Sequence, residues 1–162
     1  MAKHPSTVPA KSAPKSAEDA LTSDVLQGLK KEPKELSPVW FYHELGSFLF
    51  DNICELPEYY ITRTELQIMH GYASEMAHAI GPEAALIEFG SGTSLKTRLL
   101  LDRLESPVAY VPVDISREHL FAAAGALAKD YQNLHIVPVC ADFTQAFDLP
   151  NFIRTAPRRV VY

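Results

Sequence analysis

Apolar positions follow two different rhythms along the chain. Between residues 40 and 82 they recur three and four apart, which predicts amphipathic helices. After that, short apolar runs alternate with helical patterns. The runs predict four strands, at 84–89, at 108–115, at 134–139 and from 158 onward. Because strands that alternate with helices need right-handed crossovers onto a parallel sheet, the sequence predicts an α/β fold.

The helical stretch before the first strand predicts two helices. The first is expected to start at Gly46 with Ser47 as its N-cap and to end at Leu56-Pro57. The second is expected to start at a capping box of Thr62 and Glu65, in which each side chain satisfies a backbone N–H of the other. Gly81-Pro82 ends it. Its predicted apolar stripe is Leu66, Met69, Ala73, Met76, Ala77 and Ile80.

Two further helices are predicted between the strands. One covers residues 93–105, and the other follows Ser116, which is expected to cap it. The expected inward-facing residues are Leu95, Leu99 and Leu104 in the first, and Leu120, Ala123, Ala124 and Leu127 in the second.

The first 38 residues differ in composition from the rest of the chain. They contain five of the twelve prolines, six of the eight lysines and no aromatic residue. Such a segment cannot bury enough apolar surface to offset its ordering entropy. We therefore expect residues 1–38 to form a tail or linker, disordered over about residues 1–20, with one helical turn at 23–26. The remaining domains are expected to be a helical segment, 39–82, and a strand-rich segment, 83–162.

Composition and charge exclude several classes of protein. The formal net charge of −5 argues against a sequence-independent nucleic-acid binder, which needs a basic surface. No apolar run approaches the ~20 residues that span a bilayer, and the N-terminus lacks a secretory signal. Cys54 and Cys140 lie too far apart in sequence for a zinc motif. We expect a cytoplasmic protein with no metal, nucleic-acid or membrane partner.

A turn with two glycines follows the first strand. Glu88 precedes it, and Gly90 and Gly92 permit a tight turn and close approach of the backbone to a ligand. A dinucleotide fingerprint needs a third glycine at position 95, which is Leu95. S-adenosylmethionine has no pyrophosphate, so the incomplete pattern suits it better than NAD. A purely structural turn explains the two glycines equally well.

Acidic residues end the second and third strands. Asp114 can accept both hydroxyls of a ribose, although it can also serve as a helix cap in competition with Ser116. The Asp142 carboxylate can accept the exocyclic amine of adenine, and the N–H of Phe143 can donate to a ring nitrogen. Each feature alone is only a polar strand end. Together, after successive strands of one sheet, they predict a nucleoside-binding crevice.

Longer stretches of the sequence resemble a known family. The stretches are W-F-Y at 40–42, L-P-E-Y-Y-I-T-R-T-E at 56–65, E-F-G-S-G-T-S-L-K-T-R at 88–98 and Y-V-P-V-D-I-S at 110–116. They resemble the histidine-specific methyltransferases, which use S-adenosylmethionine to trimethylate the α-amino group of L-histidine, making hercynine in ergothioneine biosynthesis. The resemblance implies a Rossmann-like class I methyltransferase sheet, here incomplete with strands one to four, preceded by an N-terminal helical segment.

The resemblance also implies roles for individual residues. The positions that match contacts to S-adenosylmethionine are Tyr42, Gly90, Lys96, Asp114, Asp142 and Phe143. Tyr59 matches a tyrosine that helps to hold the histidine substrate. The residues themselves leave other interpretations open, with Lys96 a surface cation and the two tyrosines core aromatics. The chain departs from the usual family pattern at His43, Glu44, Leu45 and Phe48, which bears on the packing near Tyr42.

Family members continue after the fourth strand with an asparagine-bearing loop and a separate substrate domain. We therefore expect this chain to be the N-terminal half of a longer, monomeric enzyme and to be inactive alone. No catalytic base is evident in it. Another small-molecule N-methyltransferase would share the crevice at Gly90, Asp114 and Asp142 without the block at 56–65. A non-catalytic nucleotide-binding module is a further alternative.

Overall fold

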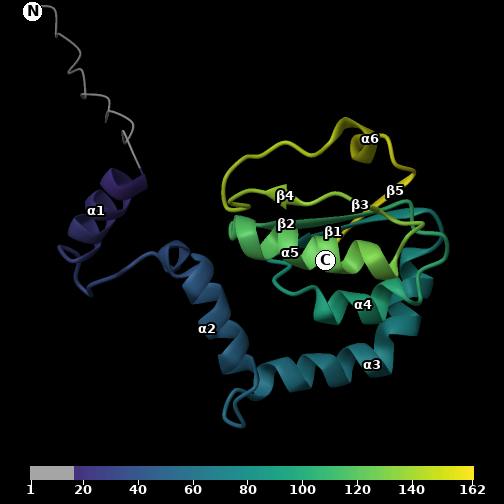
Figure 1. The fold of residues 1–162 in the computed structure, drawn as a ribbon, viewed down its shortest axis with the longest axis horizontal. Coiled ribbons are helices and arrows are strands. Elements are labelled where there is room, and N and C mark those ends of the chain that lie inside the picture. Colours follow the sequence, from purple (N-terminus) through teal and green to yellow (C-terminus); the bar gives the residue numbers. More distant parts are fainter. Residues whose placement is uncertain (1–16) are drawn as a thin grey trace, which may run out of the picture. The chain divides into compact units, whose positions relative to one another are not determined.

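The computed structural model describes residues 17–162 and shows an α/β fold (Figure 1). The chain divides into two compact units, one that ends at Trp40 and one that spans Phe41–Tyr162. The second unit contains the sheet and all the residues to which the sequence assigns a ligand. Within residues 17–162, no helix has both the length and the apolar character needed to cross a membrane.

The sheet of the second unit is parallel throughout. Its strand order is β3-β2-β1-β5, and β4 also pairs with β2. The strands are β1 (Ala84–Phe89), β2 (Ala109–Asp114), β3 (His135–Ile136), β4 (Val139–Cys140) and β5 (Arg158–Val161). The predicted third strand is thus divided into β3 and β4. The division falls at Val137-Pro138, because proline has no N–H to donate to the ladder.

Side chains of β1 and β2 alternate between two apolar layers, as the period of a strand requires. On one face, Leu86 and Tyr110 are fully buried under α3 (Tyr60–Ile80), α4 (Leu95–Leu101) and α5 (Arg117–Asp130) (Figure 1). On the other face, alternate residues of the same strands pack against Ile153 of α6 (Asn151–Arg154). The sequence analysis did not predict α6, a single turn with one buried side chain.

Of the three helix starts predicted from capping residues, the one at Ser116 is confirmed, since Ser116 is the N-cap of α5, and the other two are wrong. Helix α2 (Glu44–Cys54) begins after His43, so Ser47 lies inside it, buried, instead of capping it. Helix α3 begins after Tyr59, so Thr62 and Glu65 lie within the helix and form no capping box. The apolar stripe of α3 is confirmed, with Met69, Ala73 and Ala77 buried. Its predicted end is also confirmed, since Gly81 is the C-cap with a φ of 77°.

The helix after β1 is shorter than predicted. Ser94 has a left-handed φ of 55°, so α4 begins only at Leu95 and ends at Leu101 instead of covering 93–105. This start turns Leu95 outward, with 53% of its surface exposed, and the prediction that it faces inward is wrong. The residues of α4 that face inward are Thr97, Leu100 and Leu101, while Leu104, after the helix, is buried as predicted. The face predicted for α5 is confirmed, with Leu120, Ala124 and Leu127 buried.

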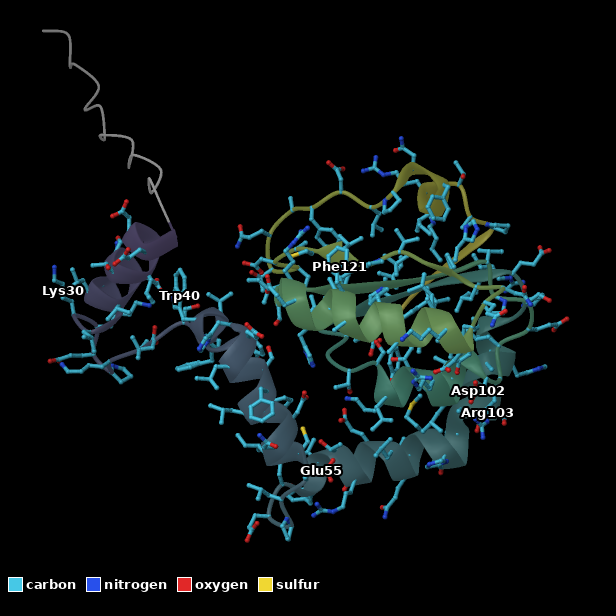
Figure 2. All side chains as sticks on the ribbon, in the orientation of Figure 1. Lys30, Trp40, Glu55, Asp102, Arg103 and Phe121 are labelled. Atoms are coloured by element: carbon cyan, nitrogen blue, oxygen red, sulfur yellow. The ribbon has the colours of Figure 1, made fainter. Side chains whose placement is uncertain are left out.

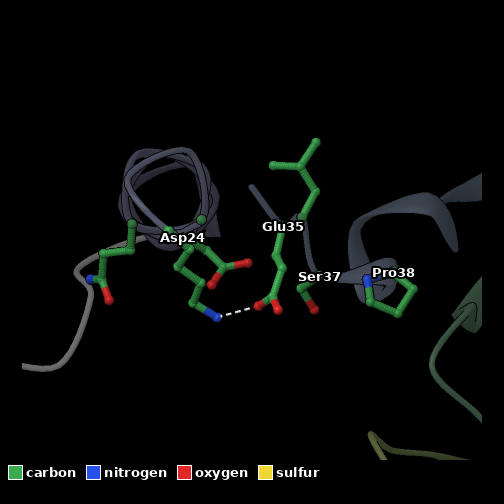
Figure 3. Close-up of a pocket in the computed structure, with 8 residues that line it drawn as sticks. Asp24, Glu35, Ser37 and Pro38 are labelled. Carbon is green, nitrogen blue, oxygen red and sulfur yellow. Dashed lines mark hydrogen bonds and ion pairs between the residues drawn. The ribbon is translucent and has the colours of Figure 1, made fainter. Parts of the chain in front are cut away.

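The first unit contains more helix than the sequence predicted. Helix α1 (Ala17–Gly28) extends the single turn expected at 23–26, so the predicted disorder is wrong for residues 17–20; residues 1–16 lie outside the described part. A 3-10 turn, η1, follows at Pro38–Phe41, and the Trp40 indole donates to Asp24 over 2.7 Å. A hollow of about 440 Å³ lies between α1 and residues 31–38, where Lys31 pairs with Glu35 (Figure 3). The hollow contains none of the predicted ligand-binding residues.

Candidate functional site

The loop between β1 and α4 is shaped by three residues in left-handed backbone conformations. Gly90 has a φ of 69°, Gly92 a φ of 49° and Ser94 a φ of 55°. Glycine adopts such angles without steric cost, whereas serine does so at a cost of about 1–2 kcal/mol. The N–H of Gly90 donates to the Val113 carbonyl over 2.8 Å, which continues the β1–β2 ladder into the loop. A Cβ added at Gly92 would meet nothing within 4 Å, so the surface beside it is open.

Asp114 connects this loop to the end of β2. Its carboxylate is only 9% exposed, and its two oxygens accept the N–H groups of Ser116 over 2.9 Å and of Gly92 over 3.2 Å. The Ala141 N–H also donates to the Asp114 carbonyl, over 3.0 Å. The ends of β1, β2 and β4 therefore meet at Asp114. The helix-cap interpretation of Asp114 is wrong, because Ser116 is the N-cap of α5. Asp114 instead accepts the N–H of Ser116 and anchors the glycine loop.

Asp142 and Phe143 follow β4 at the same edge of the sheet. Asp142 Oδ1 accepts from both the N–H and the hydroxyl of Thr144, at 2.9 and 2.6 Å. The Phe143 ring stacks on Phe89, with centroids 5.4 Å apart and an interplanar angle of 4°. The same ring lies 3.8 Å from the Cβ position of Gly90. The structure thus brings Phe143 against the glycine loop.

A buried network of hydroxyl groups and one carboxylate lies beneath the loop. Glu88 is 5% exposed, and its Oε2 accepts hydrogen bonds from Thr97 Oγ1, at 2.6 Å, and from the Tyr110 hydroxyl. The Tyr110 oxygen also bonds to Ser94 Oγ, at 2.8 Å. Burial raises the pKa of the Glu88 carboxyl, although the hydroxyls of Thr97 and Tyr110 oppose that shift. The network holds Ser94 in its left-handed conformation.

Lys96 interacts with helix α3. Its Nζ lies 2.8 Å from Glu65 Oε2, and both side chains are partly exposed. Burial disfavours the ammonium charge, but the hydrogen bond and charge of Glu65 outweigh it, so the pKa of Lys96 is raised. Glu65 therefore has the structural role of an ion-pair partner, which the capping-box prediction missed.

Helix α2 brings the segment that contains Tyr42 toward the end of β2. Ser47 Oγ donates to Ser116 Oγ over 2.9 Å in a buried contact, and Asp51 lies 3.2 Å from His119 of α5. Tyr42 lies five residues before Ser47 in sequence, and 48% of its surface is exposed. It is therefore not a core aromatic residue.

Tyr59 belongs to the helical segment that precedes the sheet. It is the N-cap of α3 and packs edge-on against Phe50, with ring centroids 5.9 Å apart. Arg63, one turn later, donates to the carbonyls of Leu56 and Pro57 over 2.8 and 2.5 Å. The Arg63 guanidinium therefore links the first turns of α3 to the loop that precedes Tyr59, which gives the arginine of the block at 56–65 a structural role.

The residues at the strand ends fit a nucleoside with an amino-acid tail. The surface beside Gly92 is open, and Asp114 lies beside it with a second lone pair on each oxygen. Between the two glycines, Ser91 Oγ is buried and has no hydrogen-bond partner in the described part of the chain. Buried polar atoms are normally satisfied, so this hydroxyl is available to a ligand.

Comparison with known proteins gives the family. The sequence model of the histidine-specific, S-adenosylmethionine-dependent methyltransferases matches residues 21–162. The chain belongs to this family. Histidine-specific methyltransferases similar to it include the histidine N-alpha-methyltransferase of Mycobacterium tuberculosis, 46% identical over 129 residues, which are 78% of this chain and 40% of that protein. The corresponding protein of Mycolicibacterium smegmatis is 44% identical over 80% of this chain and 41% of its own length.

A more distant relative is named for a different substrate. The 4-dimethylallyltryptophan N-methyltransferase of Claviceps purpurea is 31% identical to this methyltransferase chain over 64% of it and 31% of the fungal protein. The chain spans about 40% of the length of the two bacterial histidine methyltransferases. S-adenosylmethionine is the cofactor of the family, and the resemblance noted from the sequence is confirmed.

Sequence reasoning missed the residues that support the loop from below. The sequence around these residues contains no recognisable binding motif, because each occupies what reads as an ordinary strand or helix position. They are Tyr110, Thr97 and Ser94. Glu88 was recognised only as the acid that precedes the glycines. One signal was available, since a glutamate and a tyrosine inside two otherwise apolar strands must find polar partners when they are buried.

Proposed function

We propose that the full-length protein transfers three methyl groups from S-adenosylmethionine to the α-amino group of L-histidine and so forms hercynine. The observation that carries the proposal is the meeting of three strand ends at Asp114, in a chain of the histidine-specific family. In an open parallel sheet, ligands bind outside the carboxyl ends of the strands.

The nucleoside half of the cofactor is assigned to the acidic strand ends. Asp114 accepts the ribose hydroxyls, for which its position beside the open surface at Gly92 is suitable. Asp142 accepts the adenine amine through Oδ2, since Thr144 occupies Oδ1. The backbone N–H of Phe143 donates to a ring nitrogen of the base. These roles follow the family resemblance and agree with the contacts that each residue makes here.

The methionine half is assigned to the glycine loop and its neighbours. Gly90 gives the backbone conformation that allows close approach, and Lys96 supplies a cation near the start of α4. Tyr42 is assigned to the outer side of the cofactor, where its exposure leaves the ring free to cover a ligand. Tyr59 is assigned to the histidine substrate.

The chemistry requires little from the described residues beyond positioning. When bound, S-adenosylmethionine supplies an electrophilic methyl group on a sulfonium, and an unprotonated amine attacks it in line. Holding two reactants in such a geometry is worth effective molarities on the order of 10⁵ M or more. The loop network and Asp114 provide that positioning on the cofactor side. We assign no catalytic base to residues 17–162.

The direct test is an assay of the full-length gene product with S-adenosylmethionine and L-histidine. Mass spectrometry should detect mono-, di- and trimethylated histidine, with one S-adenosylhomocysteine formed for each methyl group transferred, and therefore three for each hercynine. A reaction without protein is the control. The 162-residue chain assayed alone is expected to give no product, because it corresponds to about 40% of the length of its bacterial relatives. Product formation that requires another amine, with none from histidine, would contradict the proposal.

A different amine substrate is the second candidate. It is supported by the similarity to a 4-dimethylallyltryptophan N-methyltransferase, since that relative shares the family but acts on a tryptophan derivative. Competition between L-histidine and tryptophan derivatives in one assay distinguishes the two. A nucleotide-binding module without catalysis would instead bind S-adenosylmethionine and methylate no member of the panel.

A further inference from the structure

Phe89, the last residue of β1, connects two segments that lie on either side of β2. It directly precedes Gly90, and 40% of its surface is exposed, whereas the five residues before it in β1 are buried. Its ring stacks on Phe143, which follows β4, with centroids 5.4 Å apart and an interplanar angle of 4°. Val113 of β2 pairs with Phe89 on one side and with Val139 of β4 on the other. The two rings therefore join the glycine loop to the segment after β4 across the end of β2.

The segment after β4 begins with a tight turn. Residues 141–150, between β4 and α6, form neither helix nor strand. The Asp142 carbonyl accepts the N–H of Gln145 over 3.0 Å, and Asp142 Oδ1 accepts from both the N–H and the hydroxyl of Thr144. These bonds are internal to the turn, so they fix its shape but not its position against the sheet.

The position of the turn depends on contacts at its two sides. On the strand side, the Ala141 N–H donates to the Asp114 carbonyl over 3.0 Å. On the side of the glycine loop, the Phe143 ring lies against Phe89 and 3.8 Å from the Cβ position of Gly90. The stack of two rings is therefore the contact that fixes the backbone at residue 143 relative to the glycine loop.

The proposed recognition of adenine uses two hydrogen bonds of opposite direction from this turn. Asp142 Oδ2 accepts from the exocyclic amine, and the Phe143 N–H donates to N1, the ring nitrogen beside the amine. Hypoxanthine presents the reverse pattern, since a carbonyl oxygen replaces the amine and N1 carries a hydrogen. A site that hydrogen-bonds its ligand rejects the reversed ligand, because polar groups on both are left unpaired. The rejection requires a turn that is held in place, since hydrogen bonds weaken steeply as their angle decreases.

We propose that Phe89 is a positioning residue that makes the site select adenine over hypoxanthine, by holding the turn of Asp142 and Phe143 through the ring stack. The inference rests on the proposed function and adds one residue to those assigned above. Phe89 acts through Phe143 and needs no contact with the cofactor. The interaction of an aromatic pair corresponds to about two- to twelvefold in an equilibrium constant, so the stack can enforce selection to that extent.

The test measures base preference in the full-length protein by titration calorimetry. The two ligands are S-adenosylhomocysteine and S-inosylhomocysteine, which carry adenine and hypoxanthine on the same ribose and amino-acid tail. The wild type is compared with Phe89→Leu, Phe143→Leu and the double variant. Leucine keeps the site apolar but has no ring face to stack, and Phe143→Leu retains the backbone N–H. We expect each single variant to reduce the preference for adenine by about two- to twelvefold, and the double variant to reduce it no further.

Phe147→Leu is the matched control. Phe147 also contacts the Phe89 ring, edge-on with centroids 5.9 Å apart, but it follows the turn and packs in the apolar layer that contains Ile153. The substitution therefore removes an aromatic contact of the same cluster and leaves the stack of Phe89 on Phe143 in place. It should lower the melting temperature and leave the base preference unchanged.

The outcomes separate the inference from the function on which it rests. An equal loss of both affinities in Phe89→Leu would show a general structural role and overturn the inference, while the proposed function would stand. The inference is also overturned if Phe147→Leu reduces the preference equally, if the effects of the two single variants add, or if the wild type does not prefer adenine. If the wild type binds neither ligand, the proposed function falls, and the inference with it. If Phe89→Leu does not fold, Phe143→Leu decides, since it removes the same stack from the other side.

Discussion

The strand ends and the helical segment over residues 44–80 contribute to the proposed site in different ways. At the strand ends, the Asp114 carboxylate accepts the backbone N–H groups of Gly92 and Ser116, and the Asp114 carbonyl accepts the N–H of Ala141. In the helical segment and the turn before it, the hydroxyls of Tyr59 and Tyr42 form no hydrogen bond with any described residue. Parallel sheet topology alone is enough to bring Gly92, Asp114 and Ala141 together, whereas the positions of the two tyrosines depend on contacts specific to their helices.

The same contrast appears in the burial of apolar side chains. Leu86, Val111 and Val113 in the sheet are fully buried. In α2 and α3, large apolar residues are exposed, including Phe48 at 61% and Tyr72 at 57%. Figure 2 shows Glu55 at the corner between these two helices, with side chains extending outward along both. Stability is therefore expected to depend far more on the sheet than on the outer surfaces of the helical segment.

The largest predicted effect tests this difference directly, with two leucines replaced by alanine. Leu86→Ala in β1 should lower the free energy of unfolding by about 2–5 kcal/mol, because it leaves a cavity in a fully buried layer. Leu49→Ala in α2 should change it by no more than about 0.5 kcal/mol, since Leu49 is half exposed. Urea denaturation measures both. Equal losses would show that the outer face of α2 is buried in the native protein.

Asp114→Ala should have the largest effect on cofactor binding. Removing the carboxylate leaves the N–H groups of Gly92 and Ser116 without acceptors and removes the proposed ribose ligand. The expected loss is about 1–3 kcal/mol, or about five- to 150-fold in the dissociation constant of S-adenosylmethionine. Asp148→Ala is the matched control, since the Asp148 side chain is 93% exposed at the surface. Unchanged affinity in Asp114→Ala would remove Asp114 from the cofactor site.

The sequence predicted the central strands of the sheet well, because the information that locates them is local and periodic. Apolar runs locate β1 and β2, and parallel pairing then requires Gly90 and Asp114 to meet at one edge. The predicted starts of α2 and α3 were wrong because several residues in a row can serve as a cap, and only packing selects one. Ser47 bonds to Ser116, 69 residues away, instead of capping α2. The pairing of Glu65 with Lys96 likewise depends on how α3 packs on α4, which no local pattern shows.

A smaller effect is expected in the pH dependence of stability, measured as the difference between wild type and Glu88→Gln. Burial raises the folded pKa of Glu88 above its ordinary value of 4.5, so between these values the folded state holds more protons than the unfolded state. The stability of the wild type relative to Glu88→Gln should therefore be greatest below pH 4.5 and decline as the pH rises through the folded pKa.

The direction of this pH dependence is determined by opposing effects on the Glu88 carboxyl. Thr97, Tyr110 and Lys96 favour its ionised form, while burial and Asp114 disfavour it. Urea denaturation of both proteins between about pH 4 and pH 8 gives the difference directly. A relative stability that rises with pH would show that the hydroxyls and Lys96 outweigh burial, which would reverse the predicted direction.

The smallest effect is expected for Tyr59→Phe, which removes only a hydroxyl. Since no described residue bonds to that hydroxyl, the free energy of unfolding should change by less than about 0.5 kcal/mol. Cofactor affinity should also be unchanged, because Tyr59 packs against Phe50 and makes no contact with the strand ends. If Tyr59 holds L-histidine, the KM for L-histidine should rise by about two- to twelvefold in Tyr59→Phe, which corresponds to the loss of one hydrogen bond.

Tyr60→Phe is the matched control, because Tyr60 is the next residue in the chain and is 66% exposed. A KM for histidine that changes equally in both variants, or in neither, would withdraw the substrate role from Tyr59 and leave the cofactor site at the strand ends intact.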